Sequence, residues 1–194
     1  LALDAGEPNV RTDIGGRYSL TSSAATPKLV VMLDASTIDM GSGTVLSGLK
    51  MLAPADSKVI TPLTTLLESS GLTMAEVRAA LGLPDSIDIL IFNPFDTASD
   101  PDDALAVEKV AVQVAAIVSA HAKGAEGAGA TQAESLDAAV SALTAVLQTK
   151  DQAGTTLDLS DGTDLTAIET AMNANAAALP GINATAASEI AAEV

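Results

Sequence analysis

Aspartates are the side chains in this sequence most able to do chemistry, and they gather before one expected helix. The densest group comprises Asp96, Asp100, Asp102 and Asp103. Carboxylate oxygens so closely spaced are chemically suitable ligands for a hard cation such as calcium. However, Asp100 stands directly before Pro101, as an N-cap stands before a first helical residue, and the helix dipole favours acids in the first turn. We therefore expect these carboxylates to start a helix.

A second oxygen-rich stretch, residues 158–164, alternates aspartates with small polar residues. Its spacing loosely suggests a cation-binding loop. It lacks the glutamate that closes an EF-hand loop, so we interpret it as a turn in which Asp161 or Thr163 caps the following helix.

Three threonines and one histidine are the remaining candidates for reactive groups. A nucleophilic Thr61, Thr64 or Thr65 would need a base within hydrogen-bonding reach, and the only histidine is His121, far along the chain. Helix caps and hydrogen bonds from helix to sheet are the expected use of these hydroxyls. His121 is expected at the surface near a helix C-terminus, where the dipole favours its charged form.

The composition restricts the kind of core that the chain can build. Apolar residues make up 48% of the 194 residues, yet the aromatic residues are only Tyr18, Phe92 and Phe95. A core of Ala, Leu, Val and Ile favours closely packed helices over an aromatic-lined pocket. The scarcity of aromatic rings also argues against carbohydrate binding.

Charge and cysteine content exclude several classes of function. The chain has 25 acidic and 9 basic residues, a net charge of −16, which would repel a nucleic-acid backbone or an anionic membrane. This acidic balance suits a medium rich in salt or calcium, and a solvated surface explains it equally well. Because there is no cysteine, disulfides, cysteine zinc sites and thiol chemistry are excluded.

Apolar stretches are short. The longest, residues 29–33 and 87–92, fall far below the roughly 20 residues that span a bilayer, so we expect no membrane insertion. Residue 1 is Leu and no positively charged, apolar leader precedes the expected fold, so we interpret the chain as a piece of a longer protein.

The hydrophobic pattern changes from strand-like to helical near residue 61. Residues 17–21, 28–33 and 44–52 read as short extended runs with turn formers between them. From residue 61 onward, apolar residues recur at helical spacing. Helices are expected from Pro62 to Gly71, from Thr73 to Gly82, over about 20 residues after Asp100, over 131–148, after Asp161, and over 184–194.

The N-terminal phrases resemble part of a known β-sandwich repeat. Residues 3–8 (Leu-Asp-Ala-Gly-Glu-Pro) and 12–20 (Thr-Asp-Ile-Gly-Gly-Arg-Tyr-Ser-Leu) look like the second half of a transthyretin-like or collagen-binding B-type repeat of bacterial surface proteins. In such repeats an acidic loop before this point often binds calcium. The resemblance implies that Asp4 and Glu7 are late ligands of that loop and that Asp13 lies near it.

A second set of phrases is similar to a helical module that follows such repeats in large secreted or surface proteins of Gram-negative bacteria. It comprises residues 51–67, 80–84, 92–96 and 100–115, including the string Thr-Pro-Leu-Thr-Thr-Leu and the string Ala-Leu-Gly-Leu-Pro. The resemblance covers about residues 50–120. It implies an extracellular context and no enzymatic role.

Together these observations predict an α+β protein with a partial β-sandwich over 1–56 and a helical bundle of four to six helices over 57–194. We expect that the chain is not an enzyme. We expect it to be a structural module of an extracellular or cell-surface protein that is adhesin-like or forms filaments. The alternative is a calcium-dependent adhesion module with calcium as cofactor. The expected partners are other copies or segments of the same protein, joined by strand donation to an open sheet edge.

Overall fold

A computed structural model describes residues 7–21, 28–38 and 48–182 of the chain. Two strands come first, β1 (Leu29–Met32) and β2 (Lys50–Ala53). Five helices follow in the described ranges: α1 (Pro62–Ser70), α2 (Met74–Ala80), α3 (Pro101–Gly127), α4 (Gln132–Ala153) and α5 (Gly162–Ala177). The predicted α+β class, with a small sheet before a helical part, is confirmed.

The sheet is an antiparallel pair in the described residues. Leu29 lies opposite Ala53 and Met32 lies opposite Lys50. The strand expected at 17–21 is wrong, because those residues form no ladder with the described strands. Of the run expected at 44–52, residues 44–47 lie outside the described ranges, and the strand continues through Ala53, one residue past its expected end.

Local capping signals define the first two helices as the sequence predicted. Pro62 is the first residue of α1, Thr61 is its N-cap, and Gly71 ends it in the left-handed conformation with φ of 68°. In α2, Thr73 and Glu76 form a capping box that satisfies backbone N–H groups which no helical carbonyl can reach. The short hairpin of α1 and α2 is thereby confirmed.

Two of the longer helices run further than predicted. Asp100 caps α3 through the N–H groups of Asp102 and Asp103, as expected, but the helix continues to Gly127, past the roughly 20 residues predicted for it. Likewise α4 passes Lys150 and ends only at Ala153. Asp161, one of the two proposed caps, begins α5. The helix expected at 184–194 lies outside the described residues.

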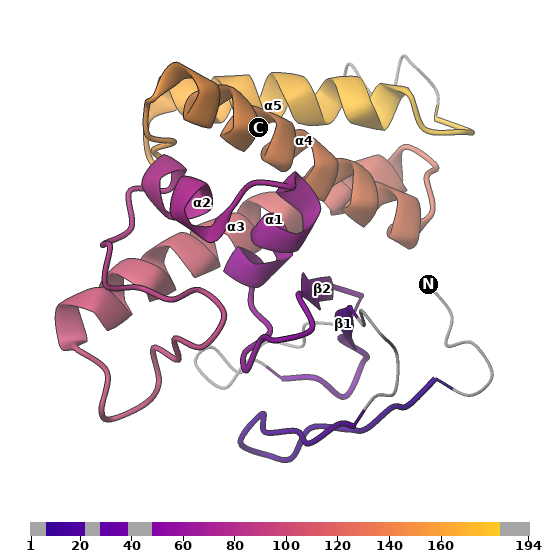
Figure 1. The fold of residues 1–194 in the computed structure, drawn as a ribbon. Helices are drawn as coiled ribbons and strands as arrows, with labels where there is room; N and C mark the ends of the chain where they lie inside the picture. Colours follow the sequence, from indigo (N-terminus) through magenta and orange to yellow (C-terminus); the bar gives the residue numbers. More distant parts are fainter. Residues whose placement is uncertain (1–6, 22–27, 39–47, 183–194) are drawn as a thin grey trace.

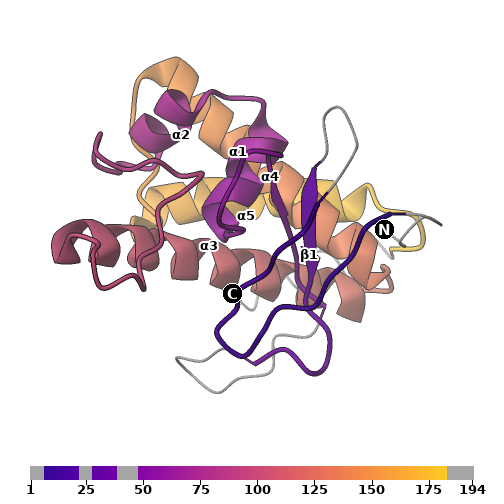
Figure 2. The same cartoon turned by 60° about the horizontal axis from the view of Figure 1, so that its bottom comes forward.

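The helices pack into one body, and the sheet lies against one side of it. In Figures 1 and 2, α4 and α5 run side by side, α3 lies along them, and α1 with α2 packs onto α4 from another side. The sheet contacts α1 through β2. The core where these elements meet is aliphatic and includes fully buried Leu63, Leu66, Ile87, Leu143, Leu147 and Ile168.

Helix α3 combines length with apolar composition. Among the helices of the described residues, it alone meets both requirements for crossing a membrane, and about 17% of its apolar window is buried in the fold. It packs against α4 and α1. No long apolar run was visible in this part of the sequence, because Glu108, Lys109, Gln113 and Ser119 stand among its apolar residues.

Truncating a central core residue should destabilise the whole body. Leu143 on α4 has no exposed surface, so Leu143→Ala removes buried methyl groups and leaves a cavity, and we expect a loss of about 2–5 kcal/mol. Urea unfolding followed by circular dichroism measures this loss. Leu105→Ala is the matched control, since Leu105 on α3 is 69% exposed, and should change stability by less than about 0.5 kcal/mol. Equal losses in both variants would contradict this position of the core.

Candidate functional site

The three threonines at the start of α1 form a joint between helix and sheet. Thr64 Oγ1 lies 2.9 Å from the carbonyl oxygen of Leu52 in β2, and Thr65 Oγ1 accepts a hydrogen bond of 3.0 Å from the Leu52 N–H. Thr61 Oγ1 accepts from the Thr64 N–H at 3.2 Å, and the Thr61 N–H donates to Thr64 Oγ1 at 2.8 Å. The predicted use of these hydroxyls as caps and helix-to-sheet bonds is confirmed.

The joint replaces a third strand on the outer edge of β2. In an antiparallel strand the N–H and C=O of one residue point to the same side, so both groups of Leu52 point away from β1. Without Thr64 and Thr65 these groups would lack partners in a partly buried position, which is unfavourable. Thr64 is fully buried and Thr65 is 5% exposed, so water cannot easily take their place.

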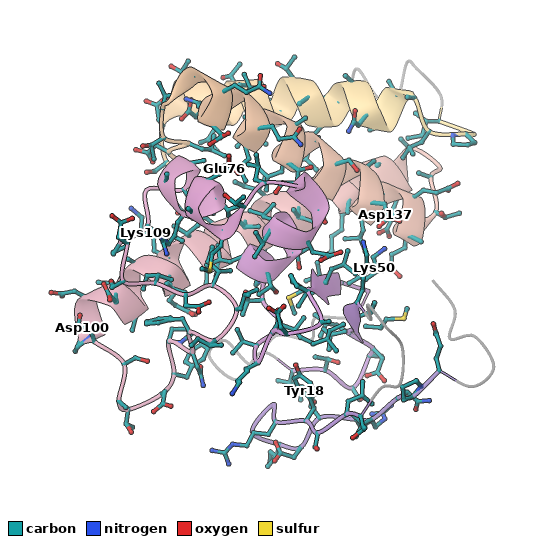
Figure 3. The ribbon with its side chains drawn as sticks, viewed as in Figure 1. Tyr18, Lys50, Glu76, Asp100, Lys109 and Asp137 are labelled. Atoms are coloured by element: carbon teal, nitrogen blue, oxygen red, sulfur yellow. The ribbon has the colours of Figure 1, made fainter. Side chains whose placement is uncertain are left out.

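A second contact ties the sheet to α4. Lys50 Nζ in β2 donates to Asp137 Oδ1 at 2.5 Å, and Figure 3 shows the two side chains meeting beside the sheet. The Lys50 side chain is mostly buried, whereas Asp137 is 59% exposed. A groove of about 120 Å³ lies between β2, α1 and α4, and Thr65, Ser69, Leu136 and Ser141 contribute to its lining. Nothing in the sequence spacing indicated this pair, because its members are 87 residues apart.

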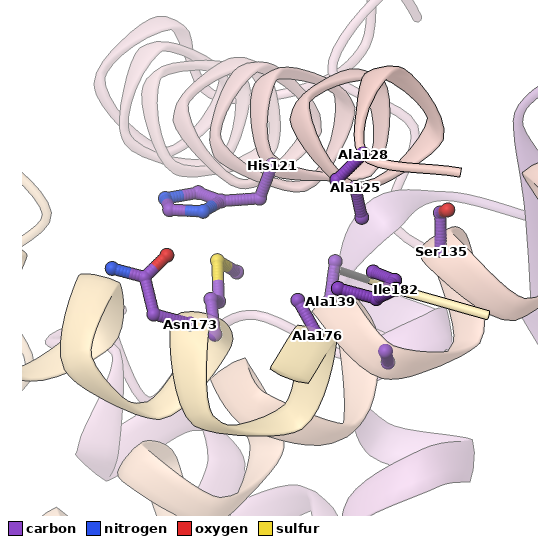
Figure 4. Close-up of a pocket in the computed structure, with 10 residues that line it drawn as sticks. His121, Ala125, Ala128, Ser135, Ala139, Asn173, Ala176 and Ile182 are labelled. Atoms are coloured by element: carbon purple, nitrogen blue, oxygen red, sulfur yellow. The ribbon is translucent and has the colours of Figure 1, made fainter. Parts of the chain in front are cut away.

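His121 is half-buried on α3 and faces α5, in contrast to the prediction of a surface residue near a helix C-terminus. It contributes to a cavity of about 20 Å³ whose lining also includes Ser135, Met172 and Asn173 (Figure 4). Burial lowers the pKa of His121, and the nearby Glu169 carboxylate partly opposes that effect. The prediction was wrong because α3 continues past His121 to Gly127, and because Met172 and Asn173 of α5 lie beside the histidine.

This cavity has little capacity for chemistry. Its volume suits about one water molecule. The Ser135 hydroxyl already donates to the carbonyl of Thr131 at 2.8 Å, so it is not free to act as a nucleophile. We therefore treat the cavity as a packing imperfection between α3, α4 and α5.

The acidic clusters serve local structure. Asp100 caps α3, while Asp103 Oδ2 accepts a 2.8 Å bond from the Ser86 hydroxyl and Asp96 accepts from the Ala98 N–H. In the second cluster Asp161 Oδ1 caps α5. Both groups were predicted to start helices, and the capping by Asp100 and Asp161 is confirmed.

Asp164 has a role that the sequence did not indicate. Its carboxylate pairs with Lys150 near the end of α4 and also accepts a 2.8 Å bond from the Asp158 N–H. The hydrogen bond from Lys150 holds the pKa of Asp164 below its ordinary value. The pair joins α4 to the turn before α5.

The calcium ligands proposed from the resemblance are only partly described. Asp4 lies outside the described residues, and Glu7 is exposed. Asp13 Oδ1 accepts hydrogen bonds from the N–H groups of Gly15 and Arg17 at 2.8 and 2.9 Å, so it organises a turn. Over residues 7–21, 28–38 and 48–182 no three acidic or histidine side chains gather as metal ligands would. A calcium site here stays a prediction.

Known proteins provide no further guide. No protein-family model, curated protein or solved structure matches the chain. The Thr61, Thr64 and Thr65 joint is therefore assessed on its geometry alone.

Removing one hydroxyl from the joint should destabilise the protein measurably. Thr65→Val keeps the shape of the side chain but leaves the Leu52 N–H without its acceptor, and we expect a loss of about 1–3 kcal/mol in urea unfolding. The control is Thr170→Val, since the exposed Thr170 hydroxyl only donates to a carbonyl of its own helix. A Thr65→Val protein as stable as the control variant would show that the joint contributes nothing.

Burial of His121 should make the protein less stable in mild acid. Because its folded-state pKa is lowered, the unfolded chain takes up the proton first as pH falls below the ordinary histidine value, so stability is lost in that direction. Melting temperatures at about pH 7.5 and about pH 5.5 should therefore differ less in His121→Gln than in the wild type. The same pH dependence in both proteins would show that His121 is not the group responsible.

Proposed function

We propose that the chain is a non-enzymatic structural module of an extracellular bacterial surface protein, adhesin-like or filament-forming, that spaces or assembles a larger polymer. The observation that carries this proposal is the joint of Thr61, Thr64 and Thr65 with Leu52. The hydroxyls best placed to be reactive are buried in bonds that fix a sheet to a helix. Such a use of polar groups suits a module whose work is to hold its shape.

The joint supports this role because it connects the sheet firmly to the helical part. A load applied through β2 would reach α1 through the two bonds of Leu52 and would reach α4 through Lys50 and Asp137. Hydrogen bonds at right angles to a strand act together to resist sliding of that strand past its neighbour. A spacer in a surface protein needs this kind of connection between neighbouring parts.

The charge supports an extracellular position and a protein partner. A net charge of −16 opposes binding to nucleic acid or to anionic lipid surfaces, and it keeps an extended polymer soluble. The partners would be other copies or segments of the same surface protein. Strand donation could use β1, whose Val30 and Met32 side chains are 39% and 58% exposed and which pairs only with β2 in the described sheet.

A calcium-dependent adhesion module is the alternative function. The observation in its favour is the Asp13 turn, which follows the acidic phrase containing Asp4 and Glu7. Calcium binds six to eight oxygens, so further ligands would have to join these three carboxylates. Under this alternative, calcium would order the segment around residues 7–17.

Amide hydrogen exchange followed by mass spectrometry tests both functions in one experiment. For the structural module, peptides covering β2 and α1 should be protected equally in calcium and in chelator, because the joint is made of hydrogen bonds between protein groups. In Thr65→Val, protection of β2 should fall while that of the α4 core is kept, and Thr170→Val should resemble the wild type. Protection of residues 7–17 that rises only with calcium would favour the alternative. Unchanged protection of β2 in Thr65→Val would contradict the proposed role of the joint.

A further inference from the structure

The sheet has one open edge, on the outer side of β1. Thr65 and Thr64 hold the outward N–H and C=O of Leu52 in β2, and Val30 lies opposite Leu52 in the ladder. Both residues of such a pair face outward, and outward residues alternate along a strand, so the N–H and C=O of Val30 and Met32 point away from β2. In the ranges that the structure describes, no protein group bonds to them.

The features that usually protect a sheet edge are missing from β1. Native edge strands avoid pairing with other chains through charged residues, prolines, bulges or a covering element. β1 is Leu-Val-Val-Met and pairs with β2 in regular register, and its Val30 and Met32 side chains are 39% and 58% exposed. Figures 1 and 2 show β2 between α1 and β1, so the outer edge of β1 faces away from that helix.

The open backbone groups determine the kind of partner that fits this edge. Val30 and Met32 present donors and acceptors two residues apart along an extended strand. Only another extended backbone repeats its own donors and acceptors at that spacing, as in recognition by addition of a strand to a sheet. The partner of β1 is therefore a strand.

A second copy of this chain supplies a strand that fits. Residues 29–33 carry no charge, so another copy of net charge −16 meets no like charge on the strand itself. The charged residues on either side are already paired within one copy. Lys28 pairs with Glu68 at 2.6 Å, and Asp34 pairs with Arg11 at 2.7 Å. The edge therefore offers no unpaired charge that would select a basic or an acidic partner, and β1 in the opposite direction presents the same uncharged edge.

We propose that β1 of one copy pairs with β1 of a second copy in antiparallel orientation, which joins the two sheets into one sheet of four strands. The inference rests on the proposed function, since it names the strand that two copies share. With Val30 opposite the partner's Val30, Lys28 lies opposite the partner's Met32, and the outward backbone groups meet in pairs. The exposed Val30 side chains then pack against each other across the new strand pair.

This contact ends at two copies. The other strand of the described sheet, β2, packs on α1 through the bonds of Leu52, so β1 is the strand left to extend that sheet. Two identical strands that pair antiparallel are related by a two-fold axis, and a contact that uses the same surface on both copies closes on itself. In a larger surface protein, the pair would join two such proteins side by side.

A proline in the middle of β1 tests the strand pairing. Val30→Pro removes the outward N–H, which makes no bond to β2, so the fold should tolerate it. We expect the mass of the wild type in sedimentation equilibrium to rise from 19.3 kDa and to level off at two copies. The contact is small, so concentrations up to about 1 mM are needed. Val30→Pro should associate at least about tenfold more weakly, because it loses both central hydrogen bonds and places a ring in the contact.

Two charge variants test the register. Val30 meets itself at the two-fold axis, so Val30→Lys alone and Val30→Glu alone each place like charges opposite each other. Each should associate about fivefold or more weakly than the wild type. An equimolar mixture of the two should associate more tightly than either variant alone, because lysine then lies opposite glutamate. The Val30 side chain is 39% exposed, so both variants should fold.

The same charges at Val112, which is 56% exposed on α3, provide the control. Val112→Lys and Val112→Glu should each associate like the wild type, and mixing them should add nothing. Every variant should keep the circular dichroism of the wild type. A wild type that stays monomeric, a mass that rises past two copies, a Val30→Pro protein that associates like the wild type, or a mixture no tighter than its components would overturn the inference. The exchange experiment on the joint does not depend on association, so the proposed function can survive any of these results.

Discussion

The arrangement of this protein depends on the two outward backbone groups of Leu52, its N–H and its C=O, which need hydrogen-bond partners. A sheet of two strands leaves its outer peptide groups without partners, and a small sheet has little stability of its own. Here the hydroxyls of Thr64 and Thr65 satisfy the outward N–H and C=O of Leu52 in β2, so the start of α1 fixes the position of the sheet. Once β2 is fixed, Lys50 reaches Asp137 and connects the sheet to α4 as well.

The helices pack closely because small residues lie where they meet. Buried alanines on α3 and α4, Ala122, Ala125, Ala139 and Ala142, allow these helices and α5 to approach closely. Small aliphatic side chains leave little unfilled space, and the cavity beside His121 has a volume of only about 20 Å³. The small size of this cavity therefore follows from a core that is built of small aliphatic side chains and few aromatic ones. Such a core suits a rigid piece better than a ligand-binding cleft.

Local signals in the sequence predicted local structure well. The caps at Thr61, Thr73, Asp100 and Asp161 were predicted because a cap and its acceptors lie within a few residues of each other. The predicted helix ends were wrong where packing overrode a local preference. Gly124 lies inside α3, since the helical turn that follows it buries Ala125.

The contacts that assemble the candidate joint were only half predictable. The string Thr-Pro-Leu-Thr-Thr-Leu indicated caps and a bond to the sheet, but not which strand residue would receive it. Lys50 and Asp137, and likewise Lys150 and Asp164, meet only because of the fold, and their spacing in the sequence has no helical or strand period. The position of His121 failed for the same reason, because only the packing of α5 covers it.

The connection between α4 and α5 has a consequence for where this chain can accept insertions. Leu157 and Leu159 are buried there, and the Leu157 N–H donates to the carbonyl of Ala80 at the end of α2. A loop anchored in this way cannot lengthen without emptying part of the core. Residues 93–99 lie mostly at the surface, so that loop can accept insertions more readily than the connection between α4 and α5.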